Sequence, residues 1–198
     1  MGQRHMDRLT SFDTSFLANE RGNGHMAIGA VLMCAGDPPA HDDFLAHIRS
    51  RVHQLPRLRQ RLLYPPLKLG TPFWVDHPDF DIDRHVRRVT LPPPSTERQF
   101  QELVGELLAP PLDRREPLWE LILVEGFQEE RFAIVYKTHH AMADGISAVD
   151  IGMLLFDADP SQEPGGEEAP WDPQPTPSRT ALALRALAGI AATARRLG

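Results

Sequence analysis

The sequence of 198 residues is poor in cysteine and has no long apolar run. Its one cysteine, Cys34, excludes an internal disulfide framework and cannot form a zinc cluster by itself. No segment approaches the roughly 20 consecutive apolar residues that a membrane-spanning helix needs, and the first six residues do not resemble a secretion signal. We therefore expect a cytoplasmic protein, and any contact with a membrane is expected to be peripheral.

Concentrated positive charge is also missing. The formal net charge is −6, and the 21 lysines and arginines are scattered along the chain. Binding to a phosphate backbone needs a basic patch, so nucleic acid is not expected as a partner. The apolar content of 41% is enough for one sizeable hydrophobic core.

Apolar periodicity predicts an alternation of strands and helices. Residues 25–35 form an almost wholly apolar run closed by GDPP, which favours a strand buried on both faces. Helical spacing predicts amphipathic helices over 42–55 and 96–108, the second with Thr96 as its N-cap, and each pattern is ended by proline. We expect further strands at 73–76, 85–91, 119–125 and 131–139, and another helix at 146–156.

The composition divides the chain into three parts. Residues 7–159 carry the strand and helix patterns and are expected to form one lobe. Residues 160–177 are rich in proline and glutamate and predict a linker. Residues 178–198 are rich in alanine and leucine and predict a helix with no obvious core in this chain to dock against, so we expect it to lead to a second, absent lobe.

The sequence HHAMADG at 139–145 carries the most informative chemistry. Neighbouring side chains of a strand point to opposite faces, so His139 and His140 are expected to have different roles. A neutral imidazole can take a proton from a hydroxyl that attacks a carbonyl and return it to the leaving group. A thiolate leaves readily, and the chain has no Gly-x-Ser-x-Gly signature, so direct acyl transfer from a thioester is favoured.

Two other interpretations of this motif exist. The two histidines at a strand end and the following Asp-Gly can simply form a turn. Alternatively, His139, His140 and Asp144 can supply ligands to a metal ion, although adjacent histidines on opposite faces fit one ion poorly.

The motif HHAMADG matches the HHxxxDG signature of the superfamily that contains chloramphenicol acetyltransferase, carnitine acyltransferases and peptide-synthetase condensation domains. Three further segments resemble motifs of one family within this superfamily and occur in the same order as they do there. They are LTSFDTSFL at 9–17, PRLRQRL at 56–62 and LDRREPLWE at 112–120. Together they resemble the bacterial wax ester synthase/diacylglycerol acyltransferase family from residue 9 to about residue 156.

The resemblance implies an α/β fold, namely a chloramphenicol acetyltransferase-like two-layer sandwich lobe with a mixed sheet and helices. In the family, acyl-CoA and an alcohol meet at the histidine in a channel between two such lobes. This sequence lacks the carboxy-terminal lobe, which would be a partner of the same enzyme.

The resemblance also implies roles for the motif residues. His140 would be the general base, and His139 would support the site from the opposite face. Asp144 would hold the loop, and Gly145 would allow a tight turn into the helix. Arg59 matches the arginine that bonds the motif aspartate in condensation-type relatives, which predicts a pair with Asp144.

The triplet Pro117, Leu118 and Trp119 resembles a motif of this family in particular. It predicts contact with the substrate channel. The other interpretation is a strand that begins at a proline and carries a buried tryptophan.

The implied activity is transfer of a long-chain acyl group from acyl-CoA to a fatty alcohol or diacylglycerol, which gives wax ester or triacylglycerol. Acyl-CoA would be a substrate, and no cofactor or metal is expected. The enzyme would work at a membrane or lipid droplet surface. The alternatives are a non-catalytic lobe that binds its partner lobe or lipid, and a condensation-type enzyme that uses carrier-bound thioesters.

Overall fold

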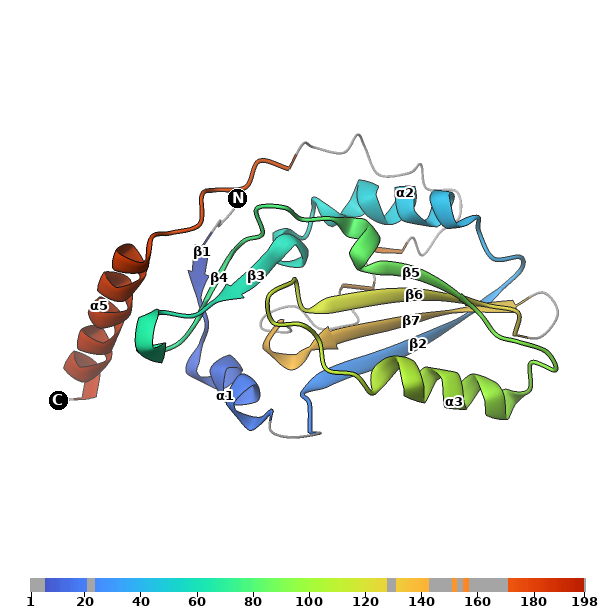
Figure 1. Ribbon diagram of the computed structural model, residues 1–198, viewed down its shortest axis with the longest axis horizontal. Helices are drawn as coiled ribbons and strands as arrows, with labels where there is room; N and C mark the ends of the chain where they lie inside the picture. The colour runs from blue at the N-terminus through green and yellow to red at the C-terminus, as the bar shows by residue number, and fades with distance from the viewer. Residues whose placement is uncertain are drawn as a thin grey trace.

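A computed structural model describes residues 6–20, 24–127, 131–142, 151–152, 155–156 and 171–197. These residues form two sheets, which lie side by side in Figure 1. The larger sheet has the strand order β2-β7-β6-β5 and the smaller one the order β1-β4-β3. Their bounds are β1 Met6–Arg8, β2 Ala27–Ala35, β3 Gln60–Leu63, β4 Phe73–Asp76, β5 Val86–Thr90, β6 Trp119–Glu125 and β7 Arg131–His139.

The larger sheet is mixed. Strand β7 pairs antiparallel with both β2 and β6, whereas β5 runs parallel to β6. The predicted strands at 73–76, 119–125 and 131–139 are confirmed with these bounds, and the strand predicted at 85–91 is observed at Val86–Thr90. The sequence pattern therefore located most of the sheet that carries the histidine motif.

Four helices are described: α1 Ser11–Asn19, α2 His41–Val52, α3 Glu97–Leu108 and α5 Arg179–Leu197. The predictions for α2 and α3 are confirmed. Helix α3 begins at a capping box, in which the Thr96 hydroxyl accepts from the backbone N–H of Gln99 and the Gln99 side chain accepts from the N–H of Thr96. Helix α1 is too short and too weakly amphipathic to be recognised from periodicity.

Helices α2 and α3 lie on opposite sides of the larger sheet (Figure 1). One core cluster joins Ile48 of α2 to Leu121 of β6, and a second joins Phe100 of α3 to Ile122 of β6. Successive strand residues point to opposite faces, so the apolar run of β6 fills both clusters. Both faces of the central strands are therefore buried, which holds the end of β7 in a fixed place.

The prediction that residues 25–35 are buried on both faces is wrong. Strand β2 lies at the edge of the sheet, and Val31 and Met33 are 40% and 49% exposed. On that face the end of α3 reaches β2 at Gly29, where a Cβ would lie 2.6 Å from Leu108 Cδ1. Val31 and Met33 lie further along the strand. An apolar run predicts a tendency to be buried but does not tell whether a neighbouring element covers it.

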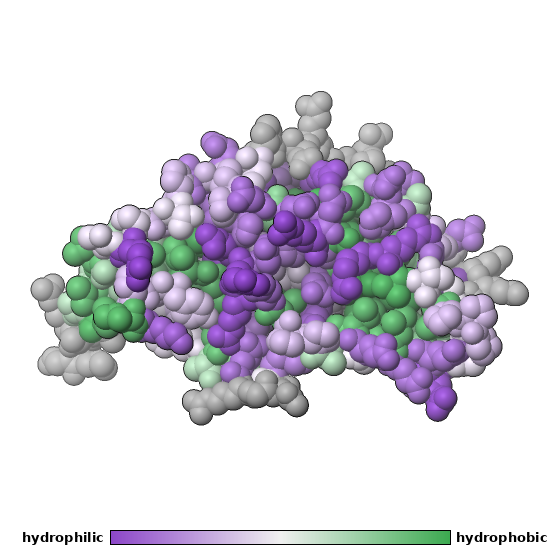
Figure 2. Space-filling model, viewed as in Figure 1, coloured by the Kyte–Doolittle hydropathy of each residue, from purple (hydrophilic) through white to green (hydrophobic). Residues whose placement is uncertain are grey.

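The expectation that the last helix has no core to dock against in this chain is also wrong. Leu182 and Ala186 of α5 are buried, and Leu182 packs on Phe73 and Val75 of β4. The opposite side of α5 leaves Leu184 and Leu187 exposed, and Figure 2 shows apolar surface at this end of the molecule. Burial of one stripe is enough to hold the helix.

Two further predictions fall largely outside the described residues. Of the helix predicted at 146–156, only residues 151–152 and 155 are described as helical. Of the linker predicted at 160–177, residues 171–177 are described, and they have no regular structure. In the described part of the chain, no helix has the length and apolar character needed to cross a membrane.

Candidate active site

The histidine motif begins at the end of β7. His139 is the last residue of the strand, and His140–Met142 form a single 3₁₀ turn. Asp144 and Gly145 lie outside the described residues, so their roles in fixing the loop stay predictions. The two histidines are consecutive in the sequence, but at the end of the strand their side chains lie in different surroundings.

His139 is enclosed, with 1% of its surface exposed. Its Nδ1 accepts a hydrogen bond of 2.9 Å from the backbone N–H of Ala141. An accepting Nδ1 carries no proton, so the neutral ring holds its hydrogen on Nε2. That Nε2 lies 3.2 Å from Oε1 of Glu20. Burial lowers the pKa of His139, although the carboxylate of Glu20 opposes this effect.

His140 is held by its backbone and one ring face. Its N–H donates to the carbonyl of Met26 at 2.8 Å, and its ring stacks on Phe16 of α1 with a centroid distance of 4.7 Å. The side chain is only half-buried, and within the described residues nothing hydrogen-bonds the ring. Of the two histidines, His140 is therefore the less enclosed and the one without a ring hydrogen bond to the described residues.

Glu20 connects several elements around this pair. Its Oε1 accepts from the N–H of Met26 at 3.0 Å, and its Oε2 accepts from Nε and Nη2 of Arg114 at 3.1 and 2.5 Å. Burial alone would raise the pKa of Glu20, but these donors outweigh it and the pKa is lowered. Glu20 is therefore a fixed negative charge next to His139.

Sequence reasoning missed both Glu20 and Arg114. Both residues lie in or near segments that resemble family motifs. Glu20 lies three residues after the segment 9–17, and Arg114 lies within the segment 112–120. The two residues are 94 positions apart, so only the tertiary structure shows that they meet.

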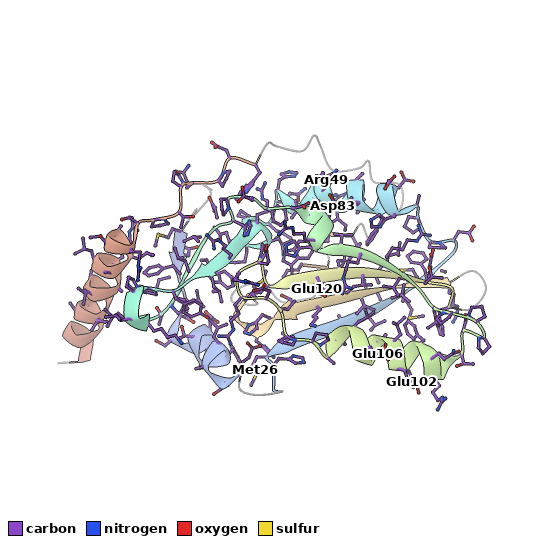
Figure 3. All side chains as sticks on the ribbon, in the orientation of Figure 1. Met26, Arg49, Asp83, Glu102, Glu106 and Glu120 are labelled. Carbon is purple, nitrogen blue, oxygen red and sulfur yellow. The ribbon has the colours of Figure 1, made fainter. Side chains whose placement is uncertain are left out.

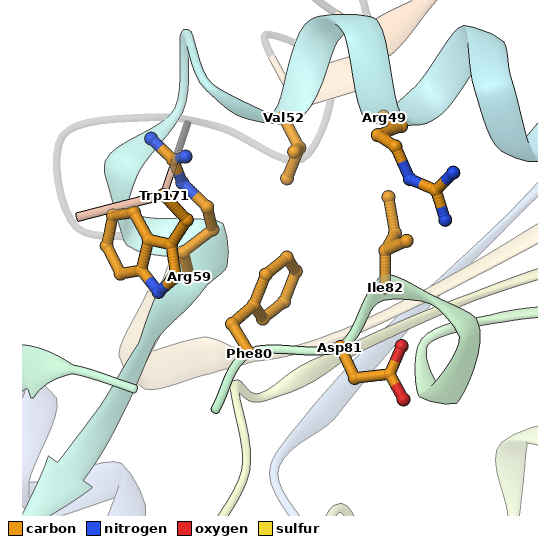
Figure 4. Close-up of a pocket in the computed structure, with 7 residues that line it drawn as sticks. All are labelled: Arg49, Val52, Arg59, Phe80, Asp81, Ile82 and Trp171. Carbon is orange, nitrogen blue, oxygen red and sulfur yellow. The ribbon is translucent and has the colours of Figure 1, made fainter. Parts of the chain in front are cut away.

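Arg59 borders a cavity of about 140 Å³, shown in Figure 4. The side chain is 3% exposed, and its guanidinium carbon lies 4.1 Å from the ring centroid of Trp171. The cavity is lined by Arg49, Val52, Arg59, Phe80, Asp81, Ile82 and Trp171. Asp144 is not among the described residues, so its predicted pair with Arg59 stays a prediction.

The triplet at 117–119 is packed inside the lobe. Leu118 and Trp119 are both 0% exposed, and Nε1 of Trp119 donates to the carbonyl of Leu58 at 2.8 Å. The carbonyl of Leu118 accepts from the N–H of His139 at 3.1 Å. These contacts agree with the interpretation as a buried strand, and contact with a substrate channel stays a prediction.

In the part of the chain that the structure describes, no three His, Cys, Asp or Glu side chains are arranged to hold an ion. The metal interpretation also used Asp144, which lies outside that part.

A family model, "Wax ester synthase/diacylglycerol acyltransferase catalytic domain", matches residues 9–198. The chain belongs to this family. It is 44% identical over 154 residues to a probable diacylglycerol O-acyltransferase of Mycobacterium tuberculosis, a match that covers 77% of this chain and 33% of the relative. A second probable diacylglycerol O-acyltransferase of that organism is 37% identical over 182 residues, which are 91% of this chain and 67% of the relative.

Solved structures share the fold of this chain. A wax ester synthase/diacylglycerol acyltransferase from Marinobacter aquaeolei VT8 superposes with a TM-score of 0.64 at 29% identity, over 84% of this chain and 42% of that one. The starter condensation domain of rhizomide synthetase gives a TM-score of 0.63 at 16% identity, over 77% of this chain and 36% of that one. The predicted chloramphenicol acetyltransferase-like α/β lobe is confirmed. The chain spans about a third of the first relatives that it matches.

Proposed function

We propose that this chain is the amino-terminal half of an acyl-CoA-dependent O-acyltransferase with His140 as its general base. The donor would be a long-chain acyl-CoA and the acceptor a fatty alcohol or diacylglycerol, as the names of its wax ester synthase and diacylglycerol acyltransferase relatives suggest. The product would be a wax ester or triacylglycerol.

The contrast between the two histidines supports this proposal most directly. His139 is enclosed, and its nitrogens face the Ala141 N–H and the Glu20 carboxylate. His140 is half-buried, is oriented by Phe16, and has no hydrogen bond to its ring within the described residues. A general base needs a nitrogen that can come within hydrogen-bond reach of the reacting hydroxyl.

The chemistry needs only this one base. A ring nitrogen of His140 takes the hydroxyl proton while the acceptor oxygen attacks the thioester carbonyl carbon. The new C–O bond forms, the C–S bond breaks, and the imidazolium gives its proton to the departing CoA thiolate. The products are the ester and CoA, and no acyl-enzyme is formed.

A partner lobe is part of the proposal. The match covers only 33% of one relative and 67% of another, so we propose that a carboxy-terminal lobe supplies the other wall of the substrate channel. Peripheral association with a membrane or lipid droplet would bring the enzyme to its apolar acceptors. A non-catalytic lobe and a condensation-type enzyme remain the competing functions.

Activity measurements separate these functions. The chain is assayed with palmitoyl-CoA and either hexadecanol or dioleoylglycerol, alone and joined to a carboxy-terminal lobe of its family. Release of CoA that matches ester formation, and that requires the second lobe, supports the proposal. Release of CoA from neither form would favour a non-catalytic role, and activity only with a carrier-bound thioester would favour the condensation type.

A further inference from the structure

Glu20 contacts the ring of His139 directly and is linked to the backbone of His140 through Met26. Its Oε1 lies 3.2 Å from Nε2 of His139 and also accepts from the N–H of Met26. The carbonyl of Met26 in turn accepts from the N–H of His140 at 2.8 Å. Met26 lies between α1 and β2, where the two segments approach the end of β7 (Figure 3).

The carboxylate is itself held from two sides. Arg114 grips its second oxygen through Nε and Nη2, and the same guanidinium donates to the carbonyl of Leu17 at 2.6 Å and to the hydroxyl of Tyr64 at 3.2 Å. A guanidinium that makes several directed bonds has little freedom to turn. Glu20 is 12% exposed at its side chain, so water competes only weakly for it.

The contact with His139 is an electrostatic one. The distance is 3.2 Å, but no partner within the described residues meets the angle of a well-aligned hydrogen bond to Nε2. A negative charge at this distance still favours the ring form that carries hydrogen on Nε2. That form leaves Nδ1 free to accept from Ala141 N–H, which closes the turn that begins at His140.

From these contacts we infer that Glu20, anchored by Arg114, is a positioning residue for the catalytic turn: it fixes the tautomer of His139 and, through Met26, the backbone of His140. The inference rests on the proposed role of His140 as the base. Glu20 contacts His139, Met26 and Arg114 and acts on the site through these residues, so in this proposal it takes no proton from the substrate.

The test compares Glu20→Gln with the matched variant Arg115→Lys. Glutamine keeps the shape of Glu20 and removes its charge. Arg115 is the neighbour of Arg114, but it is exposed and pairs with Asp113. Both variants are made in the 198-residue chain with ¹⁵N-labelled histidine. They are also made in the active form of the enzyme, which is the form that releases CoA in the assay above, either the chain alone or the chain joined to a carboxy-terminal lobe.

Nuclear magnetic resonance reports the tautomer of His139 directly, and the measurement does not require an active enzyme. In the parent chain His139 should be neutral at pH 7 with its hydrogen on Nε2. In Glu20→Gln the ring signals of His139 and the amide signal of His140 should move, while Arg115→Lys should leave them in place. The inference would be overturned if His139 of the parent chain carried its hydrogen on Nδ1. It would also be overturned if the amide signal of His140 did not move in Glu20→Gln.

Kinetics then separate positioning from folding. Glu20→Gln should lower kcat roughly 10- to 100-fold, because small misplacements of a reacting group cost this much, and should change KM for acyl-CoA little. The melting temperature should fall by only a few degrees. If His140→Ala is inactive but Glu20→Gln keeps the parent kcat and pH profile, the positioning role is wrong and the proposed function stands. If His140→Ala stays active, the proposed function itself fails.

Discussion

The indole Nε1 of Trp119 donates a 2.8 Å hydrogen bond to the backbone carbonyl of Leu58 in the interior of the lobe. This bond ties β6 to the short 3₁₀ turn Pro56–Arg59, which carries Arg59. Two segments that resemble family motifs, 56–62 and 112–120, are joined there. The tryptophan of the triplet at 117–119 therefore has a structural task whether or not a substrate passes near it.

Replacement of this tryptophan tests that task. Trp119→Phe should lower the free energy of unfolding by about 1–3 kcal/mol, because the carbonyl of Leu58 would be buried without its donor. Urea unfolding measures the change. Trp74→Phe is the control, since Trp74 is also buried but does not bond Leu58. Equal losses in the two variants would show that ring volume, and not the hydrogen bond, decides.

Removal of the proposed base should abolish catalysis without unfolding the lobe. In the active form of the enzyme, His140→Ala should lower kcat by ~10²- to 10⁴-fold, as loss of a general base typically does. The chain keeps its fold because the ring of His140 contacts Phe16 at a half-buried position. The measurement is the rate of CoA release together with a circular dichroism melt.

His41→Ala is a matched control, because it removes an imidazole at the start of α2, outside the motif. This control should keep the parent rate. His139→Ala should lower activity and stability together, since His139 is 1% exposed and bonded within the turn. A His140→Ala enzyme that keeps most of its rate would contradict the assignment.

The stability of the lobe should depend on pH through His85. This ring is 4% exposed and stacks on Trp119 at 4.8 Å, and burial lowers its pKa below the usual value of 6.5, against the opposing effect of its bond to the Trp119 carbonyl. Just below pH 6.5, His85 binds a proton in the unfolded chain but stays neutral in the folded chain. Stability therefore falls as the pH drops through this range, by at most about 1.4 kcal/mol per pH unit for one histidine.

Urea unfolding between pH 5 and 7.5 measures this dependence. His85→Gln should unfold more easily at pH 7.5 but lose less stability on acidification than the parent. His139, whose pKa burial also lowers, should add a second contribution of the same sign. An unchanged pH slope in His85→Gln would show that His85 is not held neutral in the folded chain.

Local signals explain which parts of the fold the sequence predicted. The Thr96 cap and the helical spacing of Phe100 define α3, and the run ending at His139 defines β7, because both depend on nearby residues only. The edge position of β2 and the docking of Leu182 depend on which distant elements cover them. No periodicity in the chain carries that information.

The candidate site divides in the same way. The motif predicted two histidines with different surroundings, and the structure describes an enclosed His139 and a half-buried His140. The contact of Glu20 with Arg114 could not be predicted, because it forms across 94 residues and uses side chains without a catalytic signature. Distant ion pairs of this kind appear only once the tertiary structure is known.

The last prediction concerns Asp144, which we expect to pair with Arg59 and not to relay a proton. An aspartate four residues beyond His140, before the helix predicted at 146–156, is better placed to fix the loop than to reach the imidazole. A planar guanidinium can hold such a carboxylate through two bonds. Breaking such a buried pair should cost ~3–5 kcal/mol, because one charge is left uncompensated. Arg59 is 3% exposed, so the uncompensated charge would be a buried one.

Arg59 also contacts Trp171, so Arg59→Ala alone would remove more than the predicted pair. A double-mutant cycle separates the two effects. Asp144→Ala, Arg59→Ala and the double variant are unfolded in urea, and the double variant should lose clearly less stability than the sum of the single losses. Activity should fall in each, because the loop that carries the motif is loosened. Strictly additive losses would mean that Asp144 and Arg59 do not interact, and Asp144 would then need another partner.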